Sequence, residues 1–258
     1  MRYISHKYFI APPLVDFKEE DQPYAQNYSS YNYLRSGIAS FMRRRHFEYA
    51  LRLTKNYFHR CNVIDFGCND GPLIPSLAQY FNYVVGIDKS SRWIMRASEV
   101  IRSKGLKNVK LICNHDLTLD SLKEAIGPKK FHILYLLETI EHVGDKSNPL
   151  ESKVDFIRSL FELLDDNGII VMSVPVMIGI PFLLQRIAFR LLGSNREPIS
   201  LINLIKASIL NDSSNLEKQW DGGHLGFNHR KLENYLKKEF YIPKVIDLFF
   251  QCIYVCQK

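Results

Sequence analysis

The sequence has few cysteines, and none of them stand in a paired pattern. Its 258 residues contain five cysteines and no CxxC pair. This count excludes a disulfide-stapled framework and a CxxC metal or redox motif. The segment after Met1 also lacks the apolar core of a signal peptide, because Ala11-Pro12-Pro13 follows a polar start. We therefore expect a cytoplasmic protein with buried thiols.

Long apolar runs are also missing. The most apolar stretch, Val174 to Leu184, is much shorter than the roughly 20 residues that a membrane-spanning helix needs. No RRM, KH or zinc-finger signature occurs, which weighs against a nucleic acid as the partner. A composition of 46% hydrophobic and 24% charged residues excludes a disordered or fibrous chain. The formal net charge of +7 favours an anionic or membrane-borne partner only mildly.

Short apolar runs alternate with stretches of helical period from Cys61 onward. This alternation predicts a parallel sheet with right-handed crossover helices. The last two runs are too close together for a crossover helix, so they predict an antiparallel pair at the end of the sheet. The predicted fold is α/β, a Rossmann-like, doubly wound, seven-stranded sheet with an antiparallel C-terminal strand. The predicted strands cover 61–66, 83–88, 109–113, 132–137, 168–175, 244–249 and 252–256.

We expect one domain with four parts. These are a helical N-terminal cap (1–60), a cofactor-binding core (61–175), a lid insertion (176–222), and a C-terminal helix and β-hairpin (223–258). In the cap, Arg43-Arg44-Arg45-His46 is the densest basic cluster, and it predicts either a solvated helix face or a contact with phosphate. In the C-terminal part, His229 opens a helix and is expected to be solvated or to cap it.

The strongest local signal is the run VIDFGCNDGPL. A buried strand ends near Asp65, and Gly67 to Gly71 then turn into a helix that we expect to begin at Pro72. Glycines let the backbone approach a ligand closely. A second strand ends at Asp88, which would place its carboxylate beside this loop, where ribose hydroxyls bind in such folds.

VIDFGCNDG followed by VVGIDKS resembles the first two motifs of class I S-adenosylmethionine-dependent methyltransferases, and the similarity spans about residues 40–258. Within that class the chain is similar to the type 11, ubiquinone-type O-methyltransferases. The resemblance implies S-adenosylmethionine as the cofactor. Asn69 replaces the usual middle glycine of the loop, and asparagine tolerates the left-handed backbone that the turn needs. The implied cofactor-binding residues are Asp65, Gly67, Cys68 and Gly71 for the methionine part, Asp88 for the ribose, Lys89, Asp116 and Leu117 around the adenine, and Glu138.

A second cluster follows the fourth strand, in the sequence Glu138-Thr139-Ile140-Glu141-His142. If this segment is helical, Glu138, Glu141 and His142 share one face at the carboxyl edge of the sheet. Three interpretations stay open: cofactor contact by Glu138 with Glu141-His142 capping a helix, a divalent metal site completed by His224, and a general base. The same ExxEH pattern occurs in two groups of enzymes that the chain resembles, the ubiquinone-type O-methyltransferases and the small-RNA 2′-O-methyltransferases. In the small-RNA enzymes the pattern binds a metal. A methyl acceptor that is a hydroxyl must lose its proton, and a histidine is suited to take it. We therefore assign His142, His224 and Glu141 as catalytic residues, and we assign no residue as a metal ligand.

The insertion contains FLLQRIAFRLL, which combines a wide apolar face with Arg186 and Arg190. It predicts a lid, a dimer contact, or peripheral membrane contact through 176–210. The sequence therefore predicts a methyltransferase that acts on a hydroxyl of a small or lipid-linked molecule. The alternatives are an RNA methyltransferase with a metal-assisted site, and a non-catalytic module that binds the cofactor or docks on a membrane. The oligomeric state is not predicted.

Overall fold

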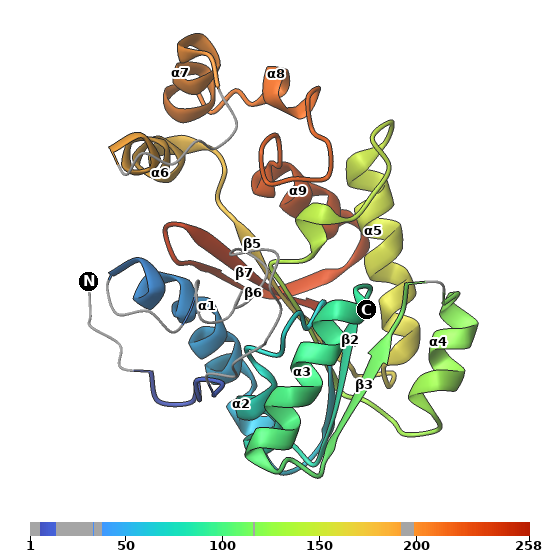
Figure 1. The fold of residues 1–258 in the computed structure, drawn as a ribbon. Coiled ribbons are helices and arrows are strands. Elements are labelled where there is room, and N and C mark those ends of the chain that lie inside the picture. Colours follow the sequence, from blue (N-terminus) through green and yellow to red (C-terminus); the bar gives the residue numbers. More distant parts are fainter. Residues whose placement is uncertain (1–5, 14–32, 34–37, 116, 192–198) are drawn as a thin grey trace.

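The computed structural model describes residues 6–13, 33, 38–115, 117–191 and 199–258. Its centre is a seven-stranded sheet in the order β3-β2-β1-β4-β5-β7-β6 (Figure 1). Strands β1 to β5 run parallel, and β7 pairs antiparallel with both β5 and β6. The predicted fold and the antiparallel C-terminal pair are thus confirmed. The strands are β1 (Asn62–Phe66), β2 (Tyr83–Asp88), β3 (Val109–Cys113), β4 (Ile133–Leu137), β5 (Ile169–Pro175), β6 (Tyr241–Asp247) and β7 (Gln251–Gln257).

Helices cover both faces of the sheet, because the central strands are apolar on both sides and leave two surfaces to bury. On one face α1, α2 and α3 pack over a cluster that includes Leu51 and Leu77. On the other, α4, α5 and α9 pack over a cluster that includes Ile157 and Leu236. These helices are α1 (Ile38–Thr54), α2 (Ile74–Tyr80), α3 (Ser91–Lys104), α4 (Leu119–Ile126), α5 (Pro149–Leu160) and α9 (His229–Glu239), with short 3₁₀ turns at 55–57, 140–142 and 161–163.

The insertion after β5 forms a separate small layer above the carboxyl edge of the sheet (Figure 1). Its helices are α6 (Gly179–Leu191), α7 (Leu201–Ile209) and α8 (Ser214–Glu217). They share a small apolar core of their own, which includes Phe182, Leu204 and Leu216. Within the described part of the chain, no helix combines the length and apolar character needed to cross a bilayer.

Three local predictions about helices and exposure are wrong. The sequence predicts that a helix begins at Pro72, but α2 begins at Ile74. The proline in its first turn is Pro75. His46 is buried and packs against Phe47, so it belongs neither to a solvated face nor to a phosphate site. His229 is buried as well, and the side chain that caps α9 is that of Asn228. Of the cap, α1 is helical as expected, whereas residues 6–13 are not.

Candidate active site

The loop after β1 has the geometry that the glycine spacing predicted. Gly67, Asn69 and Gly71 all have positive φ values, of 80°, 50° and 81°. The amides of Gly67 and Cys68 both donate to the carbonyl of Ile87, at 2.8 and 2.9 Å, which ties the loop to β2. A Cβ on Gly67 would lie 2.3 Å from the Thr139 hydroxyl oxygen, so this position excludes a side chain. Asn69 adopts the left-handed conformation in place of the usual glycine.

Two carboxylates meet at this loop, as the sequence predicted. Asp88 accepts hydrogen bonds from the Asn69 and Ser90 amides, each at 2.9 Å. Asp65 is buried, and its Oδ2 has no hydrogen-bond partner among the described residues. Burial, together with the nearby charge of Asp88, raises the pKa of Asp65 to about 7. The free oxygen of Asp65 therefore needs a proton or a cationic ligand.

A cavity of about 40 Å³ opens beside Asp65. The sulfonium and ammonium groups of S-adenosylmethionine are cations, so an orphaned buried carboxylate beneath a loop that excludes a Cβ fits this cofactor. The sequence did not single out Tyr33 and Phe47 as lining residues, because their position depends on how the cap packs over the loop. The cavity is lined by Tyr33, Phe47, Asp65, Gly67, Cys68, Asn69, Pro72, Leu73, Leu137 and Glu138.

The remaining predicted cofactor residues differ in their surroundings. Cys68 is buried, and burial raises the pKa of its thiol well above the ordinary range, so it is a packed, neutral side chain. Leu117 is exposed, and Lys89 is exposed with its charge close enough to lower the pKa of His142. Asp116 lies outside the described residues.

The segment after β4 is not the helix that the ExxEH spacing suggested. Glu138 has a φ of 52°, an uncommon value for a residue with a side chain, and only residues 140–142 form a 3₁₀ turn. Ser173 of β5 holds Glu138, since its hydroxyl donates to Oε1 at 3.1 Å. Burial raises the pKa of Glu138 to about 7. Strained backbone at a partly buried acid is typical of functional sites.

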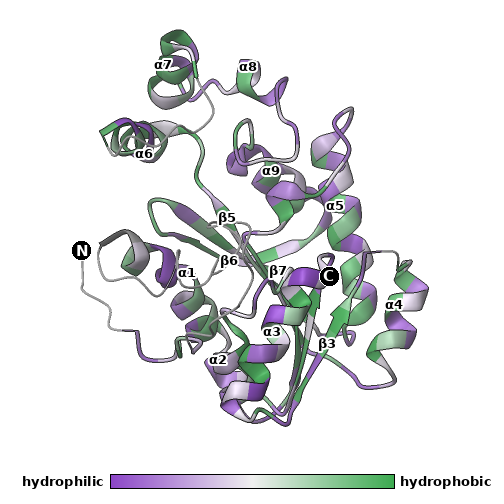
Figure 2. Ribbon diagram, in the orientation of Figure 1, coloured by the Kyte–Doolittle hydropathy of each residue, from purple (hydrophilic) through white to green (hydrophobic). Residues whose placement is uncertain are grey.

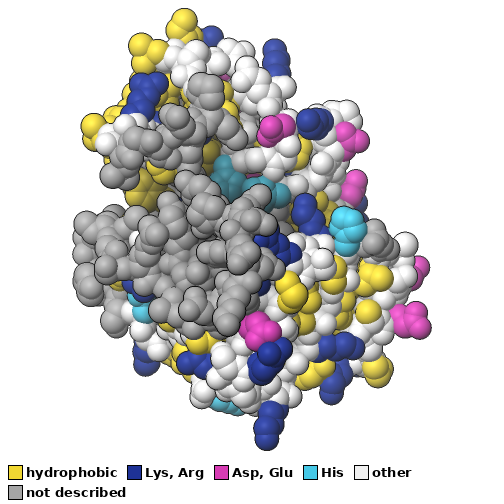
Figure 3. Space-filling view, viewed as in Figure 1, with side chains coloured by type: hydrophobic (Ala, Val, Ile, Leu, Met, Phe, Trp, Pro, Cys, Tyr) yellow, Lys and Arg dark blue, Asp and Glu magenta, His cyan; other side chains and the backbone are white. Residues whose placement is uncertain are grey.

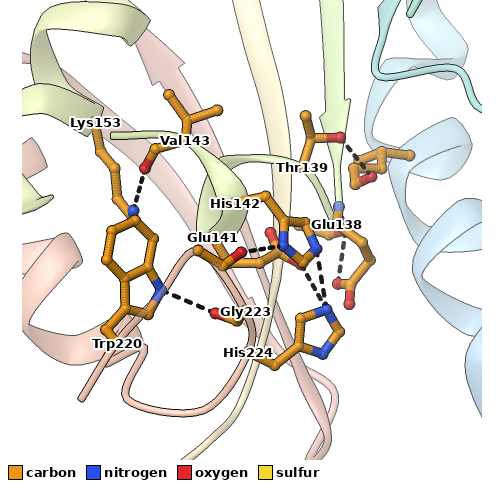
Figure 4. Close-up of polar contacts among 12 residues, drawn as sticks. Glu138, Thr139, Glu141, His142, Val143, Lys153, Trp220, Gly223 and His224 are labelled. Atoms are coloured by element: carbon orange, nitrogen blue, oxygen red, sulfur yellow. Dashed lines mark hydrogen bonds and ion pairs between the residues drawn. The ribbon is translucent and has the colours of Figure 1, made fainter. Parts of the chain in front are cut away.

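Glu141, His142 and His224 converge in front of this turn (Figure 4). Nε2 of His224 lies 3.2 Å from Nε2 of His142, and Oε1 of Glu141 lies 3.6 and 3.8 Å from these two atoms. Glu141 is fully buried, and neither of its oxygens has a hydrogen-bond partner in the part of the chain that the structure describes. Burial and the neighbouring Glu138 raise the pKa of Glu141 well above its usual range. The structure brings His224 together with Glu141 and His142, while the role of this cluster stays a prediction.

The loop that carries His224 is fixed by two residues that sequence reasoning missed. Lys153 is buried with its ammonium 4.0 Å from the ring centre of Trp220, and it donates to the carbonyl of Val143 (Figure 4). The Trp220 indole donates to the carbonyl of Gly223 at 2.9 Å. The contact between α5 and this loop is a tertiary one, which no spacing in the sequence indicates.

Comparison with known proteins agrees with this fold and loop. Residues 58–239 match the family described as "Methyltransferase domain", so the chain belongs to that family. A human protein, EEF1A lysine methyltransferase 2, is 26% identical over 114 residues, which are 43% of this chain and 46% of that protein. The chain thus spans about half the length of this curated relative.

Solved structures share the fold at low sequence identity. The PH0226 protein of Pyrococcus horikoshii has a TM-score of 0.58 at 16% identity, covering 88% of this chain and 95% of that one. N-methyltransferase NodS of Bradyrhizobium japonicum, solved with S-adenosylhomocysteine, has a TM-score of 0.52 at 12% identity, covering 84% and 87%. The methyltransferase domain of bacterial CtHen1 has a TM-score of 0.53 at 16% identity, covering 84% and 100%.

The chain is therefore a class I S-adenosylmethionine-dependent methyltransferase, and the predicted class and cofactor are confirmed. The assignment of individual site residues and of the acceptor stays a proposal.

Proposed function

We propose that the chain transfers the methyl group of S-adenosylmethionine to a hydroxyl of a small or lipid-linked acceptor, at the cluster of Glu141, His142 and His224. The observation that carries this proposal is the arrangement of the three side chains at the carboxyl edge of the sheet, around the turn that follows Glu138, a residue that lines the cavity at Asp65. When bound, the cofactor supplies an already activated methyl group, so the protein must position the acceptor and remove its proton.

His142 is suited to take that proton. Its Nδ1 lies 2.6 Å from the Gly222 carbonyl oxygen, which can only accept, so Nδ1 carries the hydrogen and Nε2 keeps its lone pair. Burial lowers the pKa of His142, so the ring is neutral at pH 7. Glu141 lies beside the ring, with its Oε1 3.8 Å from Nε2 of His142. An amine acceptor, such as the lysine of the human relative's name, is the competing substrate class.

A transfer assay tests this proposal. Purified protein is incubated with methyl-labelled cofactor and with separate small-molecule, lipid, RNA and protein fractions of a cell extract. We expect label in the small-molecule or lipid fraction, and at least a hundredfold loss of it in His142→Asn with unchanged binding of S-adenosylhomocysteine. His132→Asn is the control. His132 directly precedes β4, at the opposite edge of the sheet, and its Nε2 lies 3.1 Å from Oδ2 of Asp165. Label found only on protein amines would contradict the proposal.

A second candidate is metal-assisted methylation of an RNA end: the same three distances favour its metal ion, and its RNA acceptor follows from the resemblance of the ExxEH pattern to that of small-RNA 2′-O-methyltransferases. A tetrahedral ion with bonds of about 2.1 Å separates its ligand atoms by about 3.4 Å, and the observed separations are 3.2, 3.6 and 3.8 Å. A histidine whose other ring nitrogen donates to a backbone carbonyl, as in His142, is a common metal ligand. Two imidazoles suit zinc or manganese better than magnesium.

Metal content distinguishes the two candidates. The second candidate predicts one bound ion per chain by elemental analysis, loss of transfer in EDTA, and neither ion nor metal-dependent transfer in Glu141→Gln. It also predicts label in the RNA fraction. A protein that is free of metal and fully active in EDTA would exclude it and leave His142 as the base.

A further inference from the structure

The outer faces of α6 and α7 are apolar, which is unusual for surface helices. Ile180, Leu184, Ile187 and Leu191 are all exposed, and their spacing of four, three and four residues places them in one stripe along α6. Leu191 is 82% exposed. On α9, by contrast, the exposed positions carry Arg, Lys, Asn and Glu.

Helix α7 continues this surface. Leu201, Ile202, Ile205 and Ile209 are exposed on one side of α7, whereas Leu204 and Ala207 on its other side pack against Phe182 of α6. Figure 2 shows both helices as largely hydrophobic, and Figure 3 shows hydrophobic side chains at their outer edge. Of thirteen large hydrophobic side chains exposed in the described part of the chain, nine lie between Ile180 and Leu210.

The charged side chains on α6 and α7 themselves have a single sign, and the nearest acid in the described sequence, Asp212, follows α7 close enough for Lys206 to help lower its pKa. Residues 176–191 and 199–210 contain Arg186, Arg190 and Lys206 and no Asp or Glu. Arg190 is exposed and adjoins the α6 stripe, and Figure 3 shows basic side chains among the hydrophobic ones over this part of the molecule. A second copy of the chain would bring the like charges of α6 and α7 together across a two-fold axis, and neither of these helices carries an acid to pair them. An anionic membrane supplies both an apolar layer and phosphate groups.

We propose that the α6–α7 surface, defined by these eight stripe residues with Arg190 and Lys206, docks on an anionic lipid bilayer. The apolar stripes enter the boundary between headgroups and acyl chains, and the cations contact phosphates. Since α6 starts four residues after β5 ends at Pro175, docking holds the carboxyl edge of the sheet against the membrane. Delivery of a lipid-linked acceptor to that edge would follow, and only this consequence rests on the proposed function.

Vesicle flotation of the full chain tests the docking. We expect the protein to float with phosphatidylcholine vesicles that contain phosphatidylglycerol, and much less with pure phosphatidylcholine. Arg190→Glu with Lys206→Glu should weaken binding by about thirtyfold or more, since each basic residue near such a surface contributes about 1 kcal/mol. Ile187→Ser with Ile205→Ser should weaken it on both kinds of vesicle.

Matched controls lie on other surfaces. The apolar control is Tyr241→Ser with Val245→Ser, which removes exposed hydrophobic side chains from β6. The charge control is Lys129→Glu with Lys130→Glu, which reverses two exposed cations at the opposite edge of the sheet. Both double variants should float as wild type does. Unchanged binding of S-adenosylhomocysteine shows that each variant is folded and separates this test from that of the proposed function. Absence of flotation, or a dimer in solution that the Ile187→Ser and Ile205→Ser changes dissociate, would overturn the docking.

Discussion

Nε2 of His142 lies 3.2 Å from Nε2 of His224, although 82 residues separate them in the chain. The Gly222 carbonyl fixes the hydrogen of His142 on Nδ1, so His224 must donate to His142 from its own Nε2. In the free protein the Nε2 lone pair of His142 therefore accepts from His224, and an acceptor hydroxyl must take the place of His224 to reach it. A metal ion would need both Nε2 lone pairs and would move the His224 hydrogen to Nδ1.

The two tautomers can be observed directly. We expect long-range ¹⁵N correlation spectra at neutral pH to show His142 protonated on Nδ1 and His224 on Nε2 in metal-free protein. Addition of zinc should convert His224 to the Nδ1 tautomer if the second candidate holds. A His142 ring protonated on Nε2 would contradict the geometry from which both candidates are argued.

Gly67 should be the most sensitive glycine of the loop. Gly67→Ala strains a φ of 80° and places a Cβ 2.3 Å from the Thr139 hydroxyl oxygen. Gly105→Ala is the control, since its φ is 61° but nothing lies within 4 Å of the added Cβ. We expect Gly105→Ala to cost about 1–2 kcal/mol of unfolding free energy and to leave cofactor binding intact. Gly67→Ala should cost more and abolish the binding of S-adenosylhomocysteine, as calorimetry can measure; equal effects of the two changes would argue against a tight turn at Gly67.

Cofactor binding should release a proton from Asp65. The pKa of Asp65 is about 7 in the free protein, so near neutral pH its carboxyl is partly protonated. A cationic ligand favours the charged form and lowers that pKa, so the affinity should rise with pH up to about 7. Titration calorimetry in two buffers of different ionisation enthalpy measures the proton released. Asp65→Asn should bind more weakly and release none; an undiminished proton release in this variant would assign it to another group.

Acid should destabilise the fold partly through His46. Burial lowers the pKa of His46 to about 3 and that of His229 to about 4. Because the unfolded chain binds these protons at about pH 6.5, each histidine costs stability as the pH falls below that value, by up to about 1.4 kcal/mol per pH unit. Asp65 has a raised pKa, so its protonation in the folded protein adds stability as the pH falls from 7 to 4.

The difference in stability between wild type and His46→Asn isolates the contribution of His46 to acid destabilisation. Urea unfolding at several pH values between 6.5 and 4 should show the variant losing less stability than wild type as the pH falls. Parallel pH profiles for the two proteins would mean that the pKa of His46 is the same in the folded and the unfolded protein.

The sheet was predictable from the sequence because each strand is a short apolar run bounded by turn residues. Strands β2 and β3 have the predicted bounds. The cofactor loop was predictable for a related reason, since Gly67, Gly71 and Asp88 act through backbone conformation and position at strand ends, which are local properties.

The acceptor side was only partly predictable. The ExxEH spacing found Glu141 and His142 but predicted the wrong local structure, because Ser173 of β5 holds Glu138 in a left-handed conformation that no helix contains. Lys153 and Trp220 could not be found at all, because their contact joins α5 to the segment after the insertion. His46 looked like part of a basic surface, whereas packing of α1 on the sheet buries it.

Titration with S-adenosylhomocysteine tests the cofactor site, on which the rest of the account depends, most directly. Wild type should bind, and Asp88→Ala should bind at least about tenfold more weakly, since it also removes the acceptor of the Asn69 and Ser90 amides. Asp212→Ala is the matched control, because Asp212 likewise accepts a loop amide, that of Ser214 at 3.0 Å, between α7 and α8. The Asp212→Ala variant should bind S-adenosylhomocysteine as wild type does. Absence of binding by wild type, or equal affinity in Asp88→Ala, would contradict the assignment of this site.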